Sequence, residues 1–432
     1  MVIGIASVIL FNVVDTFWVG QLGDAELAAM SYTFPIVSVI MSLTMGLGIG
    51  TTSVVARAIG KGNREAVRRL TTDALILGMV VVLAFATTGI STIGPLFAAL
   101  GADDDTVTLI RQYMVPWYLG IGLIVIPMLG NSAIRSTGDT KTPSLIMMIA
   151  GFVNMALDPL LIFGAGPIPA MRLQGAAIAT VVSYGTTAVA AIYLLGPKKL
   201  DLLDRTRRSL ASRWDSWKQI VSIGLPAAAA NILVPLSAAI LTRIISGYGE
   251  YAVAGYGVST RIESFTMVGI GALSSALSPF VGQNYGAANY ARIREAVRFA
   301  LKASLIFGVG FALLLALTGG LISSAFSDSP EVHDVAVSYM RIVPVGYGAL
   351  GVCMLVSTAL NAINRPLPSS GLIAMRLFVF AIPLAYLGSS YLDEPGVFAG
   401  VALGNLAMGI IAWILGRSMF DTEALEEQAS HP

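Results

Sequence analysis

The chain has 432 residues, of which 56% are hydrophobic and only 12% are charged, and its formal net charge is +1. Soluble domains carry about a quarter charged residues, so a soluble fold of this length would lack the polar side chains to cover its surface, and lipid must be its solvent. The near-neutral charge gives no basic stripe for nucleic acid, and the single cysteine, Cys353, excludes a disulfide framework or a thiolate metal cluster.

Continuous apolar stretches of membrane-spanning length follow one another along the whole chain. A hydrocarbon core about 30 Å thick needs roughly 20 apolar residues per helical span. Such spans are predicted over 1–19, 27–55, 72–99, 112–134, 144–163, 174–196, 220–245, 252–281, 297–326, 336–360, 369–391 and 396–416. The stretches are continuous rather than alternating, which excludes a strand barrel. The sequence therefore predicts an all-α polytopic membrane protein with twelve transmembrane helices.

The charged residues between the spans predict the orientation of the chain. Every second loop, beginning with the one after the second span, is rich in Lys and Arg, and the remaining loops are mostly acidic, as at 103–105. Basic loops stay on the cytoplasmic side of a membrane. We therefore expect a multi-pass protein of the cell membrane with both termini in the cytoplasm.

The two halves of the chain resemble each other. An offset of 226 residues aligns Gly60 with Gly286, and the string REAVR occurs at 64–68 and again at 294–298. Six spans in each half give the two repeats the same orientation in the membrane. At this offset the counterpart of Pro226 would precede residue 1, so the first helix is expected to begin abruptly; no cleavable signal peptide is predicted.

The repeat and the charged stretch between the halves predict the domain organisation. The predicted parts are an N-terminal six-helix lobe over 1–196, a cytoplasmic linker over 197–219, a C-terminal six-helix lobe over 220–416 and a cytoplasmic tail over 417–432. The two lobes are expected to be pseudo-symmetric bundles.

Three carboxylates fall inside predicted spans: Asp15 in the first, Asp158 in the fifth and Glu263 in the eighth. A charge at mid-membrane costs about 2.5–3.5 kcal/mol on insertion scales and usually serves a function. Asp15 and Asp158 both lie about five residues before the outer ends of their helices. Asn154 is one turn before Asp158, and Thr180 lies at a similar depth in the sixth span. We expect these four side chains to meet at one level in the first lobe.

The alternative is that these four side chains only make structural hydrogen bonds between helices. The second half of the chain argues against it, because at the same offset it has apolar residues: Leu241 for Asp15, Phe380 for Asn154 and Leu384 for Asp158. Helix packing evidently does not require polar side chains at these positions, so we predict that they have a function beyond structure.

The chemistry of this set suits ion coupling. Carboxylate, amide and hydroxyl oxygens bind hard cations, and two neighbouring carboxylates repel each other, so that one of them can hold a proton. Pro159 follows Asp158 directly and removes a backbone donor, which would let the fifth helix bend in response to the charge of the site. These residues are compatible with either Na⁺ or H⁺ as the coupling ion. We predict no cofactor and no other metal.

A second group of side chains is predicted to line a substrate cavity: Tyr113, Trp117, Asn131 and Glu263. For Glu263 an internal ion pair with Arg243 or Arg261 is an equal alternative. Aromatic residues near a helix end are also typical of the interfacial belt, and the amide is also compatible with ordinary packing. Asp73, at the cytoplasmic edge of the third span, is expected to face water.

Several motifs resemble a known family. They are VVDTFWVGQLG at the end of the first span, the loop RSTGDTKTP, the run NMALDPLLIFG followed by LQGAAIAT, and PFVGQNYGAAN after the eighth span. In order and over nearly the whole chain, they resemble the multidrug and toxic compound extrusion (MATE) family. The resemblance implies two six-helix lobes that form a V-shaped cavity, alternating access, and export of organic, mostly cationic compounds against inward flow of H⁺ or Na⁺.

The resemblance also implies roles for particular residues. Asp15 matches the aspartate of the family's first helix, Asn154 and Asp158 match the pair on the fifth helix, and Thr180 matches a threonine of the sixth helix once a slightly longer loop is allowed. Some members carry an acidic residue in the seventh helix, whereas this chain has none there. Coupling is therefore expected in the first lobe.

The predicted function is a secondary active multidrug exporter, not an enzyme, acting as a monomer in the lipid bilayer on small organic cations. One alternative is a lipid-linked oligosaccharide flippase of the same superfamily, but such a protein needs cationic residues in its cavity, and the charges within these spans are mainly acidic. An intramembrane aspartate enzyme is a second alternative, although the sequence has no catalytic motif to go with the aspartates. A passive channel or a receptor is a third.

Overall fold

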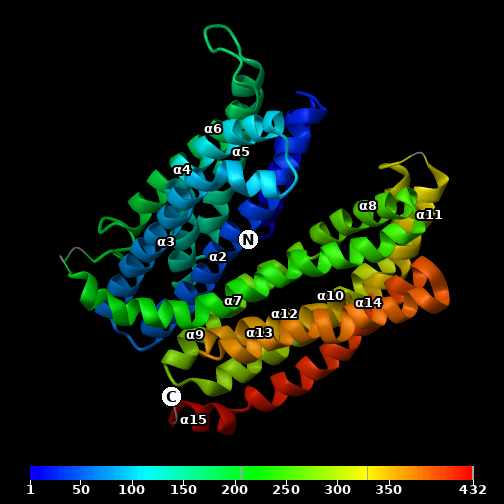
Figure 1. Ribbon diagram of the computed structural model, residues 1–432. Coiled ribbons are helices and arrows are strands. Elements are labelled where there is room, and N and C mark those ends of the chain that lie inside the picture. The colour runs from blue at the N-terminus through cyan, green and yellow to red at the C-terminus, as the bar shows by residue number, and fades with distance from the viewer. Residues whose placement is uncertain (205, 207, 328, 431–432) are drawn as a thin grey trace. The chain divides into compact units, whose positions relative to one another are not determined.

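The computed structural model describes residues 1–204, 206, 208–327 and 329–430, which form helices joined by turns and a single bridge between Ala165 and Ile168 (Figure 1). Two compact units divide the chain. Unit 1 comprises Met1–Ile59 and Asn63–Ala228, and unit 2 comprises Gly60–Gly62 and Ala229–Pro432. Unit 1 thus includes residues 197–219, the segment predicted as a linker, together with the first half of the helix that follows it.

Unit 1 is a bundle of long helices. Its elements are α1 (Val2–Gly20), α2 (Asp24–Gly60), α3 (Arg64–Ala99), α4 (Asp104–Ser136), α5 (Lys141–Phe163), α6 (Arg172–Leu195) and the first half of α7 (Leu210–Ile245). Side chains cap two of the starts, since Asn63 accepts a hydrogen bond from the Ala66 amide and Asp103 accepts one from the Thr106 amide. α4 packs against α3 and α6, and α5 packs against α1 and α6 (Figure 1).

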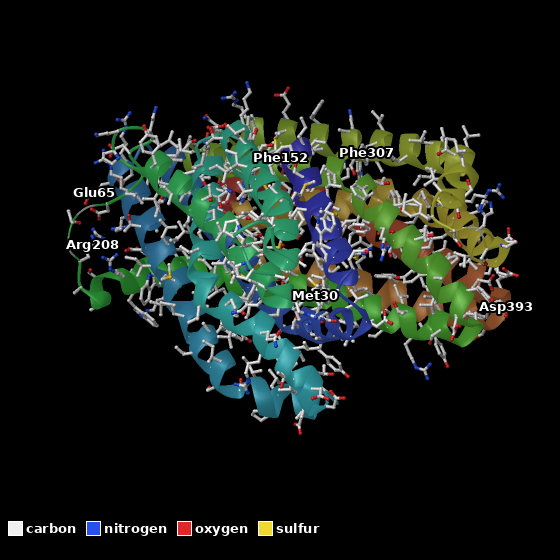
Figure 2. All side chains as sticks on the ribbon, turned by 90° about the horizontal axis from the view of Figure 1, so that it is seen from above. Met30, Glu65, Phe152, Arg208, Phe307 and Asp393 are labelled. Atoms are coloured by element: carbon white, nitrogen blue, oxygen red, sulfur yellow. The ribbon has the colours of Figure 1, made fainter. Side chains whose placement is uncertain are left out.

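The outer faces of these helices are apolar. Phe152 on α5, which Figure 2 labels, is 66% exposed, and Leu119 on α4 is 73% exposed. The inward faces bury large side chains such as Trp117 and Tyr118. Exposed apolar surface of this extent is unusual in a water-soluble protein, so the outer faces are suited to contact with lipid.

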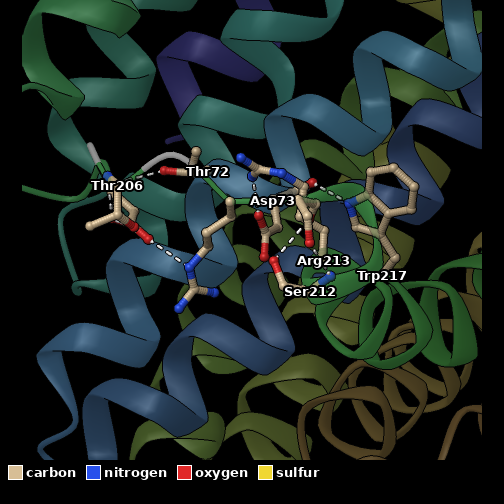
Figure 3. Close-up of polar contacts among 9 residues, drawn as sticks. Thr72, Asp73, Thr206, Ser212, Arg213 and Trp217 are labelled. Atoms are coloured by element: carbon tan, nitrogen blue, oxygen red, sulfur yellow. Dashed lines mark hydrogen bonds and ion pairs between the residues drawn. The ribbon is translucent and has the colours of Figure 1, made fainter.

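Asp73 of α3 is buried, and the prediction that it faces water is wrong. Its side chain is only 1% exposed and forms an ion pair with Arg213 of α7. The indole Nε1 of Trp217 donates to the backbone carbonyl of Asp73 at 3.0 Å (Figure 3). The carboxylate was expected in water because it lies near a helix end, but the first turns of α7 cover that end.

The segment before α7 is also fastened to α3. Arg68 of α3 forms an ion pair with Asp201, and the Asp204 amide donates to Thr72 Oγ1 at 2.8 Å (Figure 3). Arg208 in turn lies 3.3 Å from an Asp204 carboxylate oxygen. This part of the chain is therefore a docked portion of unit 1.

Unit 2 contains the remaining helices. Its elements are the second half of α7, a 3₁₀ turn η1 (Ser246–Tyr248), α8 (Glu250–Thr266), α9 (Val268–Gly286), α10 (Tyr290–Ser324), α11 (Pro330–Ile342), a second 3₁₀ turn η2 (Val343–Gly346), α12 (Tyr347–Ala362), α13 (Pro366–Ala374), a π-helical segment η3 (Met375–Ala381), α14 (Ile382–Met419) and α15 (Thr422–Ser430). α12 packs against α9, α10 and α14. Asp421, the residue before α15, forms an ion pair with Arg294 of α10.

Eleven of the described helical stretches are long and apolar enough to cross a membrane, and one of them, Pro366–Met419, has 54 residues. This stretch contains two spans, because Leu392 and Asp393 leave the helical conformation and Asp393 has φ +52°. The chain folds back there, and a Cβ atom on Gly396 would lie only 2.0 Å from the Gly388 carbonyl oxygen. Only glycine permits so close an approach. The all-α class and the twelve spans are confirmed in the described part of the chain.

Candidate functional site

The register between α1 and α5 places Asp15 beside the middle of α5. The two helices run parallel: a Cβ atom on Gly4 would meet the Ser144 side chain, and one on Gly151 would lie 3.5 Å from the Ser7 carbonyl oxygen. The small residues let the two backbones approach closely. Continuing the register by two turns brings Asp15 to the level of residues 155–159.

The register between α5 and α6 brings Thr180 to the same level. α6 runs antiparallel to α5, and Gly175 packs directly on the Leu161 carbonyl group. The Asn154 amide Nδ2 then donates a hydrogen bond to Thr180 Oγ1 at 3.4 Å, and both side chains are buried. The register of α5 against α6 thus places the Asn154 amide beside the Thr180 hydroxyl group.

The two aspartates of this cluster are buried, and Asn154 lies beside Asp158 as a neighbouring polar group. Asp15 is 6% exposed and Asp158 is 0% exposed, and the two lie within range of electrostatic interaction. Neither oxygen of Asp158, nor Oδ1 of Asp15 or Asn154, has a partner among the described residues. Burying an uncompensated carboxylate is costly, so these oxygens are available to a proton or a cation.

Two aromatic residues of α4 lie in the interior of unit 1. Tyr113 and Trp117 are both buried, which does not fit the alternative of an interfacial belt. Tyr113 lies within electrostatic range of both Asp15 and Asp158. It therefore belongs to the surroundings of the acidic cluster, and Trp117 follows it by one helical turn.

Two neighbours of the cluster were missed in the sequence. Trp18 lies three residues after Asp15, and its buried Nε1 has no partner among the described residues. Tyr184 follows Thr180 by one turn of α6 and interacts electrostatically with Tyr113. The helical spacing of three or four residues from an intramembrane polar residue was the signal that could have found both.

Asn131 does not join this cluster. It follows Tyr113 on the same helix at a distance of about 27 Å along the axis, from a rise of 1.5 Å per residue. Its side chain is buried, and its Oδ1 has no partner among the described residues. The neighbouring Ser132 carbonyl accepts a hydrogen bond from Thr52 Oγ1 at 3.3 Å. Asn131 thus lies near the opposite end of α4.

Glu263 lies in unit 2, in a separate polar network. Its Oε2 accepts hydrogen bonds from the hydroxyl groups of Tyr339 and Tyr347, the second at 3.3 Å. Arg376 interacts with it electrostatically and donates to Asn405 Oδ1 at 3.2 Å. Arg376 belongs to the π-helical segment η3, a type of distortion that often marks functional sites.

The partners of Glu263 differ from those considered in the sequence. The structure pairs it with two tyrosines, whereas Arg243 donates to Ser246 Oγ at 3.3 Å. Its role in a substrate cavity remains a prediction. No group of three or more His, Cys, Asp or Glu side chains that could hold a metal ion occurs among the described residues.

Comparisons with known proteins agree with this architecture. The MatE family model matches residues 1–160 and 226–387. The FAD transporter of Shewanella oneidensis is 38% identical over 415 residues, which are 96% of this chain and 92% of that protein. The probable multidrug resistance protein YoeA of Bacillus subtilis is 26% identical over 383 residues, 88% of this chain and 83% of that protein. The crystal structure of the Vibrio cholerae MATE transporter VcmN in the bent form has a TM-score of 0.92 at 30% identity and covers 98% of this chain and 95% of its own. The chain therefore belongs to the MATE family of membrane transporters.

Proposed function

We propose that this protein is a secondary active exporter of small organic compounds, driven by the inward flow of H⁺ or Na⁺ through alternating access. The observation that carries the proposal is the cluster of buried, unpartnered oxygens on Asp15 and Asp158, with Asn154 and Thr180 at the same level. Both termini would lie in the cytoplasm, as the distribution of Lys and Arg between the loops indicates.

The coupling ion would act by changing the charge of the cluster. A proton or a sodium ion bound there relieves the repulsion between the two carboxylates. Pro159 leaves the Met155 carbonyl without its helical donor, so α5 can bend at this point. The ion shifts the equilibrium between inward and outward states only as far as its affinity for the two states differs. The ion is cargo in this scheme, and no resident cofactor is needed.

The favoured substrates are small organic cations. The buried carboxylates of unit 1 attract positive charge, and the multidrug-resistance relatives are compatible with such substrates. In this scheme substrate and coupling ion compete for the same negative charge. Binding of one then favours release of the other, which is the requirement for antiport.

A second candidate substrate is a flavin dinucleotide. The 38% identical relative is named an FAD transporter. Unit 2 also holds Arg376, whose guanidinium group is suited to phosphate, near an aromatic set in which the rings of Tyr256 and Tyr339 are 5.9 Å apart. The anionic cluster of unit 1 would then serve the coupling ion alone.

The two candidates are separated by transport in proteoliposomes with proton and sodium gradients imposed one at a time. One arm follows a fluorescent organic cation and the other follows FAD. Asp15→Asn should abolish gradient-driven movement of the true substrate, whereas Asp105→Asn, an exposed carboxylate at the start of α4, should leave it unchanged. Undiminished coupled transport in Asp15→Asn would remove this residue from the mechanism. No movement of either compound under either gradient would contradict both candidates.

A further inference from the structure

A groove with a volume of about 570 Å³ lies on the outer surface of unit 1, between residues 108–119 of α4 and 174–178 of α6. Its lining includes Arg111, Gln112, Val115 and Leu119 of α4 and Gln174 and Ile178 of α6. The groove is shallow and open, and its accessible lining is mostly apolar.

The residues that line the groove change from polar to apolar along the helix axes, from the beginnings of α4 and α6 toward the middle of the membrane. α4 and α6 run parallel, because Gly120 packs against Val181 and Gly130 packs against Leu195. This register places Gln112 at the level of Gln174. The apolar lining residues Val115, Leu119 and Ile178 follow within two turns, about 4 to 11 Å further along the helices. Such a step matches the boundary between the head groups and the hydrocarbon core of a bilayer.

The groove faces away from the acidic cluster. Tyr113 and Trp117 point into unit 1 and are buried, whereas Arg111 and Leu119 are exposed on the other side of the same helix. A molecule in the groove would therefore lie on the lipid-facing surface, outside the cluster that holds the coupling ion.

The polar residues Arg111, Gln112 and Gln174 of the groove offer donors and a positive charge that can bind a phosphate ester. Arg111 is the cation of the groove and takes part in none of the ion pairs among the described residues; its Nη2 atom lies near Gly94 of α3. Pro116 cannot donate to the Gln112 carbonyl, which leaves this acceptor free beside the Gln112 and Gln174 amides. Asp104 and Asp105 precede Arg111 by about 10 Å along the axis, toward the water, so their negative charge lies beyond the phosphate level.

We propose that this groove binds one anionic phospholipid. The phosphate lies on the Arg111 guanidinium, hydroxyl groups of the head group reach the Gln112 carbonyl and the Gln174 amide, and an acyl chain lies along Val115, Leu119 and Ile178. Arginine recognises phosphate through a planar set of donors. The site is independent of the transported substrate.

The test is native mass spectrometry of the purified full-length protein after exchange into mixed micelles with phosphatidylglycerol or phosphatidylcholine. The wild-type protein should retain one phosphatidylglycerol more tightly than phosphatidylcholine. One arginine near an anionic surface contributes on the order of 1 kcal/mol, so Arg111→Gln should weaken retention about fivefold. Arg261→Gln is the matched control, since it removes an exposed arginine of α8 outside the groove.

A second variant tests the groove itself without changing its charge. Ile178→Trp fills the apolar part and should expel the lipid, while size-exclusion profile and helical content stay unchanged. Equal retention of the two lipids by the wild type would overturn the proposal. So would an Arg111→Gln variant that matches Arg261→Gln, or an Ile178→Trp variant that keeps its phosphatidylglycerol.

Discussion

The three carboxylates inside predicted spans, Asp15 and Asp158 of unit 1 and Glu263 of unit 2, have different surroundings. In unit 1, Asp15 and Asp158 are buried with oxygens that no described side chain or backbone group satisfies. In unit 2, Glu263 has two tyrosine hydroxyl groups as donors and a guanidinium group nearby. The carboxylate of Glu263 already has hydrogen-bond donors, whereas the unpartnered oxygens of Asp15 and Asp158 can accept a proton or a cation. The proposed function assigns ion coupling to unit 1 because of this difference, and the following experiments test that assignment.

The largest expected effect is on transport. Asp158→Asn should lower gradient-driven efflux at least tenfold, because an amide cannot take up and release a proton or balance a cation. Glu263→Gln should keep most of the activity, since its amide oxygen can still accept from Tyr339 and Tyr347. Initial rates in proteoliposomes measure both. Equal losses in the two variants would break the contrast between the units.

Stability should change in the reverse order. Asp158→Leu places in unit 1 the residue type that the second half carries at the matching position, Leu384, and removes a buried carboxyl group whose oxygens have no partner among the described residues. It should raise the melting temperature in detergent. Glu263→Leu strands two buried hydroxyl groups and should cost about 1–3 kcal/mol. A stabilised Glu263→Leu variant would show that the unit 2 network is not structural.

A smaller effect is expected at Thr180. Thr180→Val removes the hydroxyl group that accepts from Asn154, a contact worth about 1 kcal/mol. The ion concentration for half-maximal transport should rise about fivefold, with little change in maximal rate. Thr180→Ser is the matched control and should behave as the wild type. An unaltered ion dependence in Thr180→Val would remove the hydroxyl group from the site.

The smallest effect concerns acid pH and the docked segment before α7. Hydrogen bonds from the Thr206 amide and hydroxyl, together with the charge of Arg208, hold the pKa of Asp204 below its ordinary value of 3.8. The stabilisation is present above that value and is lost only as the pH falls through the lowered pKa. Limited proteolysis of this segment should therefore give the same rate at about pH 7 and about pH 5. Faster cleavage at the lower pH would show that acid loosens this segment well above the lowered pKa of Asp204, which would contradict the prediction.

The sequence predicted the spans and the acidic cluster because both depend on distance along a helix. Depth in the membrane follows from the number of residues, so Asp15, Asn154 and Thr180 could be placed at one level before any packing was known. The direction in which a side chain points around the bundle depends on helix packing. Glycines such as Gly4 and Gly175, which set the registers, are not distinctive in a chain with 45 of them.

The partners of Glu263 could not be predicted for the same reason. Tyr339 and Tyr347 are 76 and 84 residues away in the sequence, and nothing in their local pattern points to Glu263. The burial of Asp73 was missed because Arg213, 140 residues later, lies in a stretch that reads as a free charged linker. Ion pairs over such separations become visible only when the helices are packed.

The docking of residues 197–204 on α3 has a practical consequence for spectroscopy. Lys199, with its ammonium group 5.8 Å from the centre of the Tyr193 ring, belongs to this segment and is fixed to unit 1 through Asp201 and Asp204. A spin label or fluorophore attached there would move with α3 as one body. It would serve as a fixed reference point for measuring motion elsewhere in the transporter.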